Sequence, residues 1–595
     1  MRIIVAIVLL AISTLSLAVG IAERTVFDEP ETIERVITTD TKAPATIIPG
    51  SILTSYPGRQ TITIQGGVSG LVPDESGEGF FRGESDQAFV AYGSTLDVMA
   101  WLAPGRHTKL SYDPVRTELS QLPRSGDTFL PDPQGSDLWF NEFSGEGDVT
   151  FSLAGNEDIT VLVMTDGVLP APQTITISWP GATEAPWILA ALILGVLTFI
   201  AGVIVALSSL VSWRQRRGPR RKRTRSIRAP RRRRAGFGRS RRPRRPAPTR
   251  KGGRRVASRV VLPLVGGLVL GLGACAAPAV VVAEDETETT AAAPNPAVTE
   301  SQFATIMARV AGQIQLADQE LSVNTLNPRV TEPTLSARRV AYIVTRADAE
   351  AQRVMPIPSS PIRLVLPQQT TGWPRSVFAV IQDEQDLETP SLGVVLRQED
   401  PRSNYRLTYA IVLNPQVQLP DLPPATLGAA KLRADSKLTR VTPSALLAHY
   451  ADVANSGADS PFVEEFALAT DTLYSQMGPE ALQLRQESFG DSVEVSWSTS
   501  VTDQEIVAFS TSNAGALVMG TLRQVERVAP VQSGAAVNSS IGIRALTSLS
   551  QSSVGFDVDS DVQILFYVPP VGSEEGVRVL GYTYSLVAAR EVGNE

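Results

Sequence analysis

The chain has 595 residues, of which 43% are hydrophobic and 19% charged, and its formal net charge is −7. This length allows several domains. The single cysteine excludes an intrachain disulfide and a thiolate metal cluster. The chain has two histidines, in regions that we predict to be separate domains, which argues against a His-based metal site or a Ser-His-Asp triad.

The charge is distributed unevenly along the chain. Residues 213–259 contain 23 Lys or Arg and no Asp or Glu, which leaves 31 basic and 61 acidic residues elsewhere. A segment so basic and so poor in apolar residues is expected to be disordered. We expect this loop to contact anionic lipid headgroups. A specific cytoplasmic partner is the alternative, and nucleic-acid binding is not expected because Phe237 is the only aromatic residue after Trp213 in this loop.

Three uncharged apolar segments predict transmembrane helices. The first, 3–22, is either an uncleaved anchor, which we favour, or a signal peptide. The second, 187–211, is long, apolar and bracketed by tryptophans, as is common at membrane interfaces. The third, 260–283, is softer because it contains glycine and proline.

The position of the basic loop between the second and third segments sets the expected topology. The positive-inside rule keeps this loop in the cytoplasm. The acidic regions 23–186 and 284–595 are then both extracytoplasmic, and the sequence predicts a multi-pass protein of the cell membrane.

The third apolar segment contains Leu272-Gly-Ala-Cys275, the pattern of a bacterial lipobox. A basic stretch precedes it, and a flexible acidic linker, 284–298, follows it, as in a lipoprotein signal. Two interpretations stay open. Either Cys275 is lipidated and the chain is cut there, or 260–283 is an uncleaved transmembrane helix, which we favour.

The first outer region is predicted to contain a linker, 23–59, and an all-β sandwich, 60–183. Short runs rich in β-branched and aromatic residues alternate there with Gly, Pro, Asp and Ser, which favours antiparallel strands. We expect Trp101, Trp139 and Phe140 to fill the sandwich core rather than to bind carbohydrate, and His107 to lie in a loop. The runs are 61–64, 88–92, 95–101, 137–140, 149–153, 159–163 and 175–179.

The second outer region is predicted to form two α+β units, 299–425 and 440–590. The first begins with a capping box, Thr299-Glu-Ser-Gln302, and the second with the N-cap and proline pair Thr442-Pro443. In each unit, helices are followed by an antiparallel sheet. The predicted strands are 362–366, 376–381, 392–396 and 405–413 in the first unit, and 493–498, 516–528, 541–546, 562–568 and 577–587 in the second.

The predicted fold class is therefore a multidomain membrane protein. It has three transmembrane helices, an extracytoplasmic β-sandwich and two tandem units in which a curved sheet wraps around helices. The paired units resemble the cystatin-like or NTF2-like architecture. Through Arg329-Val-Thr-Glu-Pro-Thr-Leu-Ser-Ala-Arg-Arg-Val-Ala-Tyr342, the chain also resembles uncharacterised actinobacterial membrane proteins with such a C-terminal pair. That resemblance implies no specific activity.

No residue is predicted to be catalytic or to bind a metal or cofactor, and we expect no cofactor. His449 lies on a helical apolar stripe beside Tyr450, which favours a satisfied, partly buried histidine. Asp557-Val-Asp-Ser-Asp561 resembles the start of a calcium loop, but the glycine and glutamate that such a loop needs are missing. We therefore expect an exposed turn or strand edge there.

The leading hypothesis is a non-enzymatic, membrane-anchored cell-envelope protein that presents binding or scaffold domains. Its partners would be the lipid bilayer and an envelope polymer or another membrane protein. Two alternatives remain: an envelope enzyme of glycosidase or transferase type that uses unrecognised carboxylates, and a structural subunit of a membrane complex. A pair of carboxylates in a deep cleft would favour a glycosidase.

Overall fold

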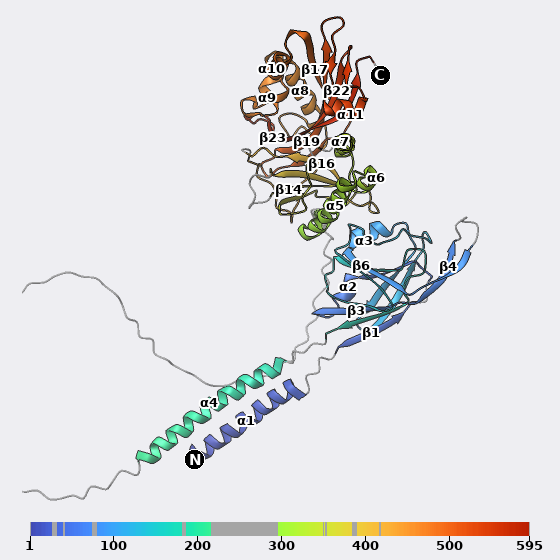
Figure 1. Ribbon diagram of the computed structural model, residues 1–595. Helices are drawn as coiled ribbons and strands as arrows, with labels where there is room; N and C mark the ends of the chain where they lie inside the picture. The colour runs from blue at the N-terminus through green and yellow to red at the C-terminus, as the bar shows by residue number, and fades with distance from the viewer. Residues whose placement is uncertain are drawn as a thin grey trace, which may run out of the picture. The chain divides into compact units, whose positions relative to one another are not determined.

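The structure is a computed structural model that describes residues 2–26, 32–39, 42–73, 80–180, 186–215, 295–348, 350, 354–382, 390–415 and 418–593 (Figure 1). The chain divides into two compact units. One comprises Met1–Ala22 with Trp187–Ala292, and the other comprises Glu23–Pro186 with Ala293–Glu595.

The first unit contains two helices that pack side by side, α1 (Arg2–Val26) and α4 (Pro186–Gln215) (Figure 1). Their contacts run in opposite chain directions, because Leu17 lies against Gly195 and Leu10 against Gly202. A Cβ at Gly195 would meet Leu17 at 2.9 Å, so glycine allows this close approach. The helices are antiparallel.

A buried hydroxyl fixes the register of this helix pair. Ser13 Oγ donates to the carbonyl of Gly195 at 2.9 Å, and Ser13 is fully buried. Because a buried polar group without a partner is costly, this bond favours one alignment of the two helices over a shifted one.

The prediction of three transmembrane helices is wrong. Within the ranges that the structure describes, no helix combines the length and the apolar character needed to cross a membrane. Segments 3–22 and 187–211 do lie in helices, so their apolar composition predicted the secondary structure but not a membrane span. The predicted location as a multi-pass protein of the cell membrane is overturned with it. Segment 260–283, including Cys275, and almost all of the basic loop lie outside the described residues.

Residues 32–180 form two main sheets that face each other. One has the order β1-β12-β3-β10 and the other β8-β7-β2-β11-β6-β9, and all pairs are antiparallel except β2 with β7. A separate hairpin pairs β4 with β5. The elements are β1 (Ile33–Thr38), β2 (Ala45–Pro49), α2 (Gly50–Leu53), β3 (Arg59–Gln65), β4 (Val68–Pro73), β5 (Phe80–Ser85), β6 (Gln87–Ser94), α3 (Thr95–Leu102), β7 (His107–Asp113), β8 (Glu118–Arg124), β9 (Asn141–Glu146), β10 (Val149–Ala154), β11 (Ile159–Met164) and β12 (Thr174–Trp179).

The inner faces of these sheets bury alternate residues, as in Ile62 and Ile64 of β3 and Ile175 and Ile177 of β12. This arrangement is consistent with the β-sandwich that the alternating pattern indicates. Several details differ from the sequence prediction. The segment predicted as a linker contains β1 and β2, and residues 137–140 form turns rather than a strand.

Helix α3 replaces the strand predicted at 95–101. Ser94 caps it by accepting from the backbone N–H of Asp97 at 3.1 Å. The segment is rich in apolar residues, and Val98, Trp101 and Leu102 pack into a second core on the outer face of the larger sheet. A strand would send alternate residues away from this core, whereas one helical face turns all three toward it.

Residues 295–593 contain two further sheets, with the orders β13-β14-β15-β16 and β17-β19-β22-β23, and β18 pairs with β19. The first group of elements is α5 (Glu300–Glu320), α6 (Val323–Leu326), α7 (Thr334–Ala347), β13 (Ile362–Pro367), β14 (Arg375–Ile381), β15 (Leu392–Gln398) and β16 (Arg406–Val412). The second is α8 (Pro443–Ser456), α9 (Tyr474–Met477), α10 (Pro479–Phe489), β17 (Val493–Val501), β18 (Val507–Ser510), β19 (Ala516–Pro530), β20 (Val537–Asn538), α11 (Ile541–Thr547), β21 (Gln551–Ser552), β22 (Phe556–Val568) and β23 (Arg578–Glu591), with 3-10 turns at Gly457–Asp459, Val463–Glu465, Leu468–Thr470 and Gly490–Ser492.

The start signals of both predicted units are confirmed. Thr299 and Gln302 form a reciprocal capping box at α5, and Thr442 caps α8 ahead of Pro443. The strand predicted at 541–546 is wrong. These residues form α11, because the Ser540 side chain accepts from the backbone N–H of Ile543 and so caps a helix.

The two C-terminal sheets pack face to face and share one core. Phe378 and Tyr409 of the first sheet lie in the same cluster as Phe509, Leu517 and Tyr567 of the second. Because side chains alternate along a strand, the neighbouring residues of each sheet point the opposite way, toward helices. The result is four layers in the order helix, sheet, sheet, helix.

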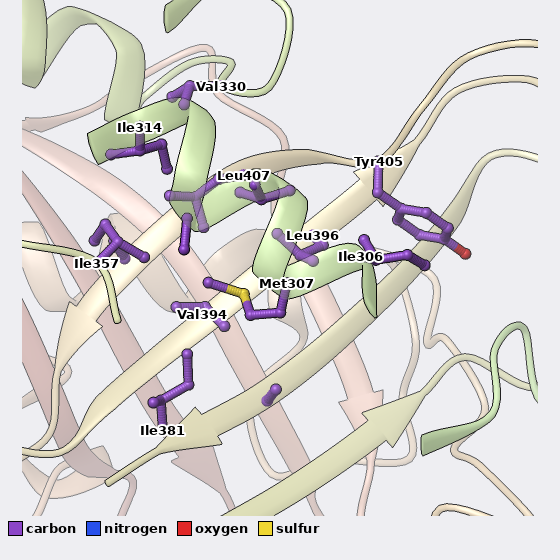
Figure 2. Close-up of a cluster of buried hydrophobic side chains, with 14 of the residues drawn as sticks. Ile306, Met307, Ile314, Val330, Ile357, Ile381, Val394, Leu396, Tyr405 and Leu407 are labelled. Atoms are coloured by element: carbon purple, nitrogen blue, oxygen red, sulfur yellow. The ribbon is translucent and has the colours of Figure 1, made fainter. Parts of the chain in front are cut away.

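Figure 2 shows the outer core of the first sheet, where Met307 of α5 lies over Val394 and Leu396 of β15. In the second sheet, Leu446 and Tyr450 of α8 play the same role. Every residue of β14 is buried, because both faces of its sheet are covered. The space between each sheet and its main helix is therefore filled by side chains and does not form an open pocket.

Buried charges join the sandwich to this C-terminal block. The Asp137 side chain is fully buried and accepts from Arg329 Nη1 at 2.5 Å and from the backbone N–H of Tyr405 at 2.8 Å. Arg309 Nη1 lies 3.4 Å from the same carboxylate. A second buried pair joins Asp97 to Arg375 at 2.7 Å.

We predict that Asp137→Ala lowers the free energy of unfolding by about 3–5 kcal/mol, since it leaves Arg329 charged, mostly buried and unpaired. Urea denaturation followed by tryptophan fluorescence measures this change. Asp435→Ala is the control, because Asp435 and its partner Arg433 are both exposed and such pairs contribute little. An equal effect of the two substitutions would show that the Asp137 contact does not hold the sandwich in place.

Candidate functional site

A large cavity lies along α5. Its volume is about 950 Å³. Ala308, Ala311 and Gly312 form one wall, and their small side chains leave a hollow in the helix surface. The other wall comes from the end of α7 and from the extended segment 354–360. The remaining lining residues are Gln315, Asp318, Gln319, Leu321, Thr345, Val354, Pro356, Ile357, Pro358, Ser359 and Ser360.

Gly312 faces open space in the middle of α5. A Cβ placed on this glycine would meet no atom within 4 Å. Glycine inside a helix costs roughly 0.5–1 kcal/mol relative to alanine. No neighbouring atom requires glycine here, and Gly312 is exposed, so the missing side chain leaves the hollow open at this point.

Asp318, which lines this cavity, belongs to a charged cluster with Arg338 and Tyr342. Arg338 Nη1 donates to both oxygens of Asp318, at 2.5 and 2.7 Å, and Tyr342 Oη donates to Asp318 at 2.6 Å. Arg338 is almost fully buried, whereas the Asp318 side chain is 23% exposed. Burial, and then the hydrogen bond to Asp318, raises the pKa of Tyr342 well above its ordinary value, so Tyr342 stays a neutral donor.

Arg338 also lines a second, smaller cavity of about 390 Å³. This cavity lies between α7 and strands β22 and β23. Gln563 forms part of it and accepts from the Thr334 hydroxyl and from the backbone N–H of Ala410. Val354 and Ile357 line both cavities. The two hollows are therefore neighbours, and Arg338 of the second donates to Asp318 of the first.

The aspartates at 557, 559 and 561 lie in β22, which is a central strand, so the expectation of an exposed turn or strand edge is wrong. Their carboxylates are buried and are held by arginines on the adjacent strands. Arg527 and Arg523 each donate two hydrogen bonds, to Asp557 and Asp561, and Arg590 donates to Asp559. The three acids therefore form cross-strand ion pairs.

Neither histidine belongs to a catalytic cluster among the described residues. His449 Nδ1 lies 2.7 Å from Glu465 Oε2, and the ring stacks on Phe462, with 3.7 Å between the ring centroids. This matches a satisfied, partly buried histidine. His107 starts β7 rather than lying in a loop, and its Nδ1 contacts the carbonyl of Gly105 at 3.0 Å.

The aromatic residues proposed to fill the sandwich separate into two groups. Trp101 and Trp139 are buried in contact with each other, but they lie in the second core on the outer face of the larger sheet and not between the two sheets. Phe140 is 37% exposed, so the expectation for it is wrong. It lies in the turn region and packs edge-on against Tyr92. Cys275, the possible lipidation site, is outside the described residues. No group of three His, Cys, Asp or Glu side chains in the described ranges is placed to hold a metal ion.

Neither the cavity nor the cluster of Asp318, Arg338 and Tyr342 was predicted from the sequence. One signal was present, because Arg338 and Tyr342 are four residues apart in α7 and so share a helix face. Both are buried, although arginine is seldom buried without a partner. The partner Asp318 lies on α5, so only the fold brings the cluster together.

We predict that Gly312→Ala raises the free energy of unfolding by about 0.5–1 kcal/mol, because the methyl group enters empty space and removes a helix-interior glycine. Thermal or urea unfolding measures this effect. Gly520→Ala is the matched control and should destabilise, since its Cβ would lie 2.5 Å from Leu447 Cδ1. If Gly312→Ala also destabilises the protein, the hollow is not open.

We predict that Asp557→Asn lowers the free energy of unfolding by about 1–3 kcal/mol at neutral pH. The hydrogen bond from Arg527 holds the pKa of Asp557 below its ordinary value of 3.8. The carboxylate therefore stabilises the fold above that value, and this contribution disappears as the pH falls through the lower folded pKa.

The measurement compares the stability of wild type and Asp557→Asn from neutral pH to below pH 3.8. Their difference should shrink at the acid end. Asp459→Asn, at an exposed turn position, is the control and should change stability little throughout. A difference that stays constant with pH would contradict the ion-pair explanation.

A family described as "Domain of unknown function (DUF8094)" matches residues 294–591. The match begins next to the first described residue of the C-terminal block and covers both of its sheets and the cavity. No curated protein and no solved structure matches the chain.

Proposed function

The chain belongs to the DUF8094 family, and we propose that it is a binding protein whose C-terminal block takes a small uncharged ligand into the cavity along α5. The observation that carries this proposal is the hollow at Gly312. A helix-interior glycine faces about 950 Å³ of open space, where alanine would be more stable. A ligand bound in that space would account for glycine instead of alanine at position 312.

The size and lining of the cavity support this function. Ligand pockets commonly have volumes of about 300–1,000 Å³ and combine apolar walls with a few polar groups. Here Pro356, Ile357 and Pro358 supply an apolar wall. Gln315 and Gln319 supply amide groups from successive turns of α5, each of which can both donate and accept.

The charges of the cavity favour a neutral ligand. Asp318 is the one acidic residue that lines it, and Arg338 holds this carboxylate through two hydrogen bonds. The pair is neutral as a whole, so an ionic ligand would find no uncompensated partner. A ligand with hydroxyl or amide groups can instead bond to the glutamines and to the hydroxyls of Thr345 and Ser359.

The sandwich contributes as a scaffold in this proposal. Arg309 and Gln302, on the first turns of α5, donate to Asp137 and to backbone carbonyls of the sandwich. These bonds hold the N-terminal half of the helix whose C-terminal half lines the cavity. The scaffold therefore limits how far α5 can move when the cavity is filled.

An enzymatic alternative needs two carboxylates that face one cleft. Asp471 and Glu480 line one cavity, beside the start of β23, and burial raises the pKa of Asp471. However, Asp471 accepts from the backbone N–H groups of Leu473 and Tyr474 and from the Tyr450 hydroxyl. These bonds give Asp471 a structural role at the start of α9.

The proposal is tested by comparing the full chain with Gly312→Leu and Gly312→Ala. We expect leucine to fill the hollow and alanine to leave it open. Ligand-observed NMR is recorded with neutral sugars, polyols and N-acetyl amino-acid amides. At least one of these probes should bind the wild type and Gly312→Ala, and its binding to Gly312→Leu should be about tenfold weaker or more, which corresponds to about 1.4 kcal/mol.

Unfolding measurements accompany the comparison and show whether Gly312→Leu is folded. The proposal fails if no probe binds the wild type, or if a probe binds folded Gly312→Leu as well as it binds the wild type. In the second case the binding site lies elsewhere on the protein.

A further inference from the structure

A separate cavity of about 790 Å³ lies between the start of β23, the segment 467–480 and residues 414 and 418. It shares no lining residue with the cavity along α5. Its wall contains one cationic side chain, Arg578, and two acidic ones, Asp471 and Glu480. The partners of these three groups decide what the cavity can bind.

Arg578 has a guanidinium group without an anionic partner in the described part of the chain. Its Cζ lies 4.9 Å from the centroid of the Tyr567 ring, which supports one face of the group. Its Nε is buried and has no hydrogen-bond acceptor among these residues. Guanidinium has five donors and binds planar carboxylates through two parallel hydrogen bonds. Arg578 is therefore placed to receive an acceptor from a ligand.

Glu480 is the complementary group. It is exposed at the first turn of α10 and makes no ion pair or hydrogen bond within the described ranges. Its charge reaches the cavity, because it contributes to the raised pKa of Tyr474 after the larger effect of burial. Arg578 and Glu480 are not paired with each other, although they line the same space.

Asp471 is already committed. Its two oxygens accept the three hydrogen bonds from Leu473, Tyr474 and Tyr450, at 2.9, 3.0 and 2.7 Å. The cavity thus has one uncommitted cation and one uncommitted carboxylate. The hydroxyls of Thr470 and Ser475 also line it and can bond to either end of a ligand.

We propose that this cavity binds a zwitterion of the α-amino-acid type. The ligand carboxylate bonds to Arg578, and its ammonium group bonds to Glu480. A simple anion would meet Glu480 as a like charge, and a simple cation would meet Arg578. A ligand that carries both charges satisfies both groups and leaves neither unpaired.

The test uses the full chain and isothermal titration calorimetry with the standard L-amino acids as probes. At least one should bind. For that amino acid, two analogues remove one charge each: the amine without the carboxylate, and the N-acetyl derivative without the ammonium group. Each should bind at least about tenfold more weakly, the loss expected for one charge-assisted hydrogen bond.

The variants Arg578→Gln and Glu480→Gln assign each charge to its residue. Arg578→Gln should weaken binding of the amino acid about tenfold and leave binding of the amine analogue unchanged. Glu480→Gln should also weaken binding of the amino acid about tenfold, and it should leave binding of the N-acetyl analogue unchanged. Arg433→Gln, which removes an exposed arginine elsewhere, is the control and should bind as the wild type does. Thermal unfolding without ligand shows that each variant is folded, and the exposed Glu480 position tolerates substitution even if the Arg578 position does not.

The inference is overturned if no amino acid binds, if both glutamine variants bind as tightly as the wild type, or if acetate binds as well as the amino acid. It is independent of the cavity along α5. Gly312→Leu should bind the amino acid with unchanged affinity, so the two proposals can fail separately.

Discussion

The face-to-face packing of two sheets is the constraint on which the C-terminal block depends. Phe378, Tyr409, Phe509 and Tyr567 lie in one cluster, so each sheet covers one face of the other. Each sheet must then cover its other face with helices, α5 in one case and α8 in the other. The cavity along α5 follows from this order of layers, because it forms where α5 meets α7 and the 354–360 segment outside the filled core. The family match spans both sheets, as a shared core requires.

Buried ion pairs determine how the elements of the protein are arranged relative to one another. Asp137 joins the sandwich to the block, and Asp318 joins α5 to α7. Along β22, acids pair with arginines on the adjacent strands. In each place, loss of one partner leaves a buried charge, so each pair fixes one arrangement of the elements that carry it. Arg578 differs from these arginines because no carboxylate in the described ranges accompanies it.

The sequence predicted elements well where a local signal was decisive. The capping box at Thr299 and the pair Thr442-Pro443 mark helix starts, and both depend on residues within one turn. The segments 95–101 and 541–546 are helices, not the predicted strands. The prediction relied on their apolar or β-branched composition and overlooked the capping serines, Ser94 and Ser540. The cavities could not be predicted, since Gly312, Arg338 and Ile357 meet only after α5, α7 and the following segment have packed. The membrane spans failed for another reason. The apolar composition correctly predicted helices, but it was not sufficient to predict that these helices span a membrane.

The pairing of β1 with β12 has a consequence for the order of folding. These strands are the first and last of the sandwich, and Ile33 lies opposite Trp179. Once the sandwich has formed, its two ends are neighbours, although more than a hundred residues separate them in the chain. Because closing so long a loop costs entropy, this pair is expected to form only together with the strands between them, whose contacts offset that cost.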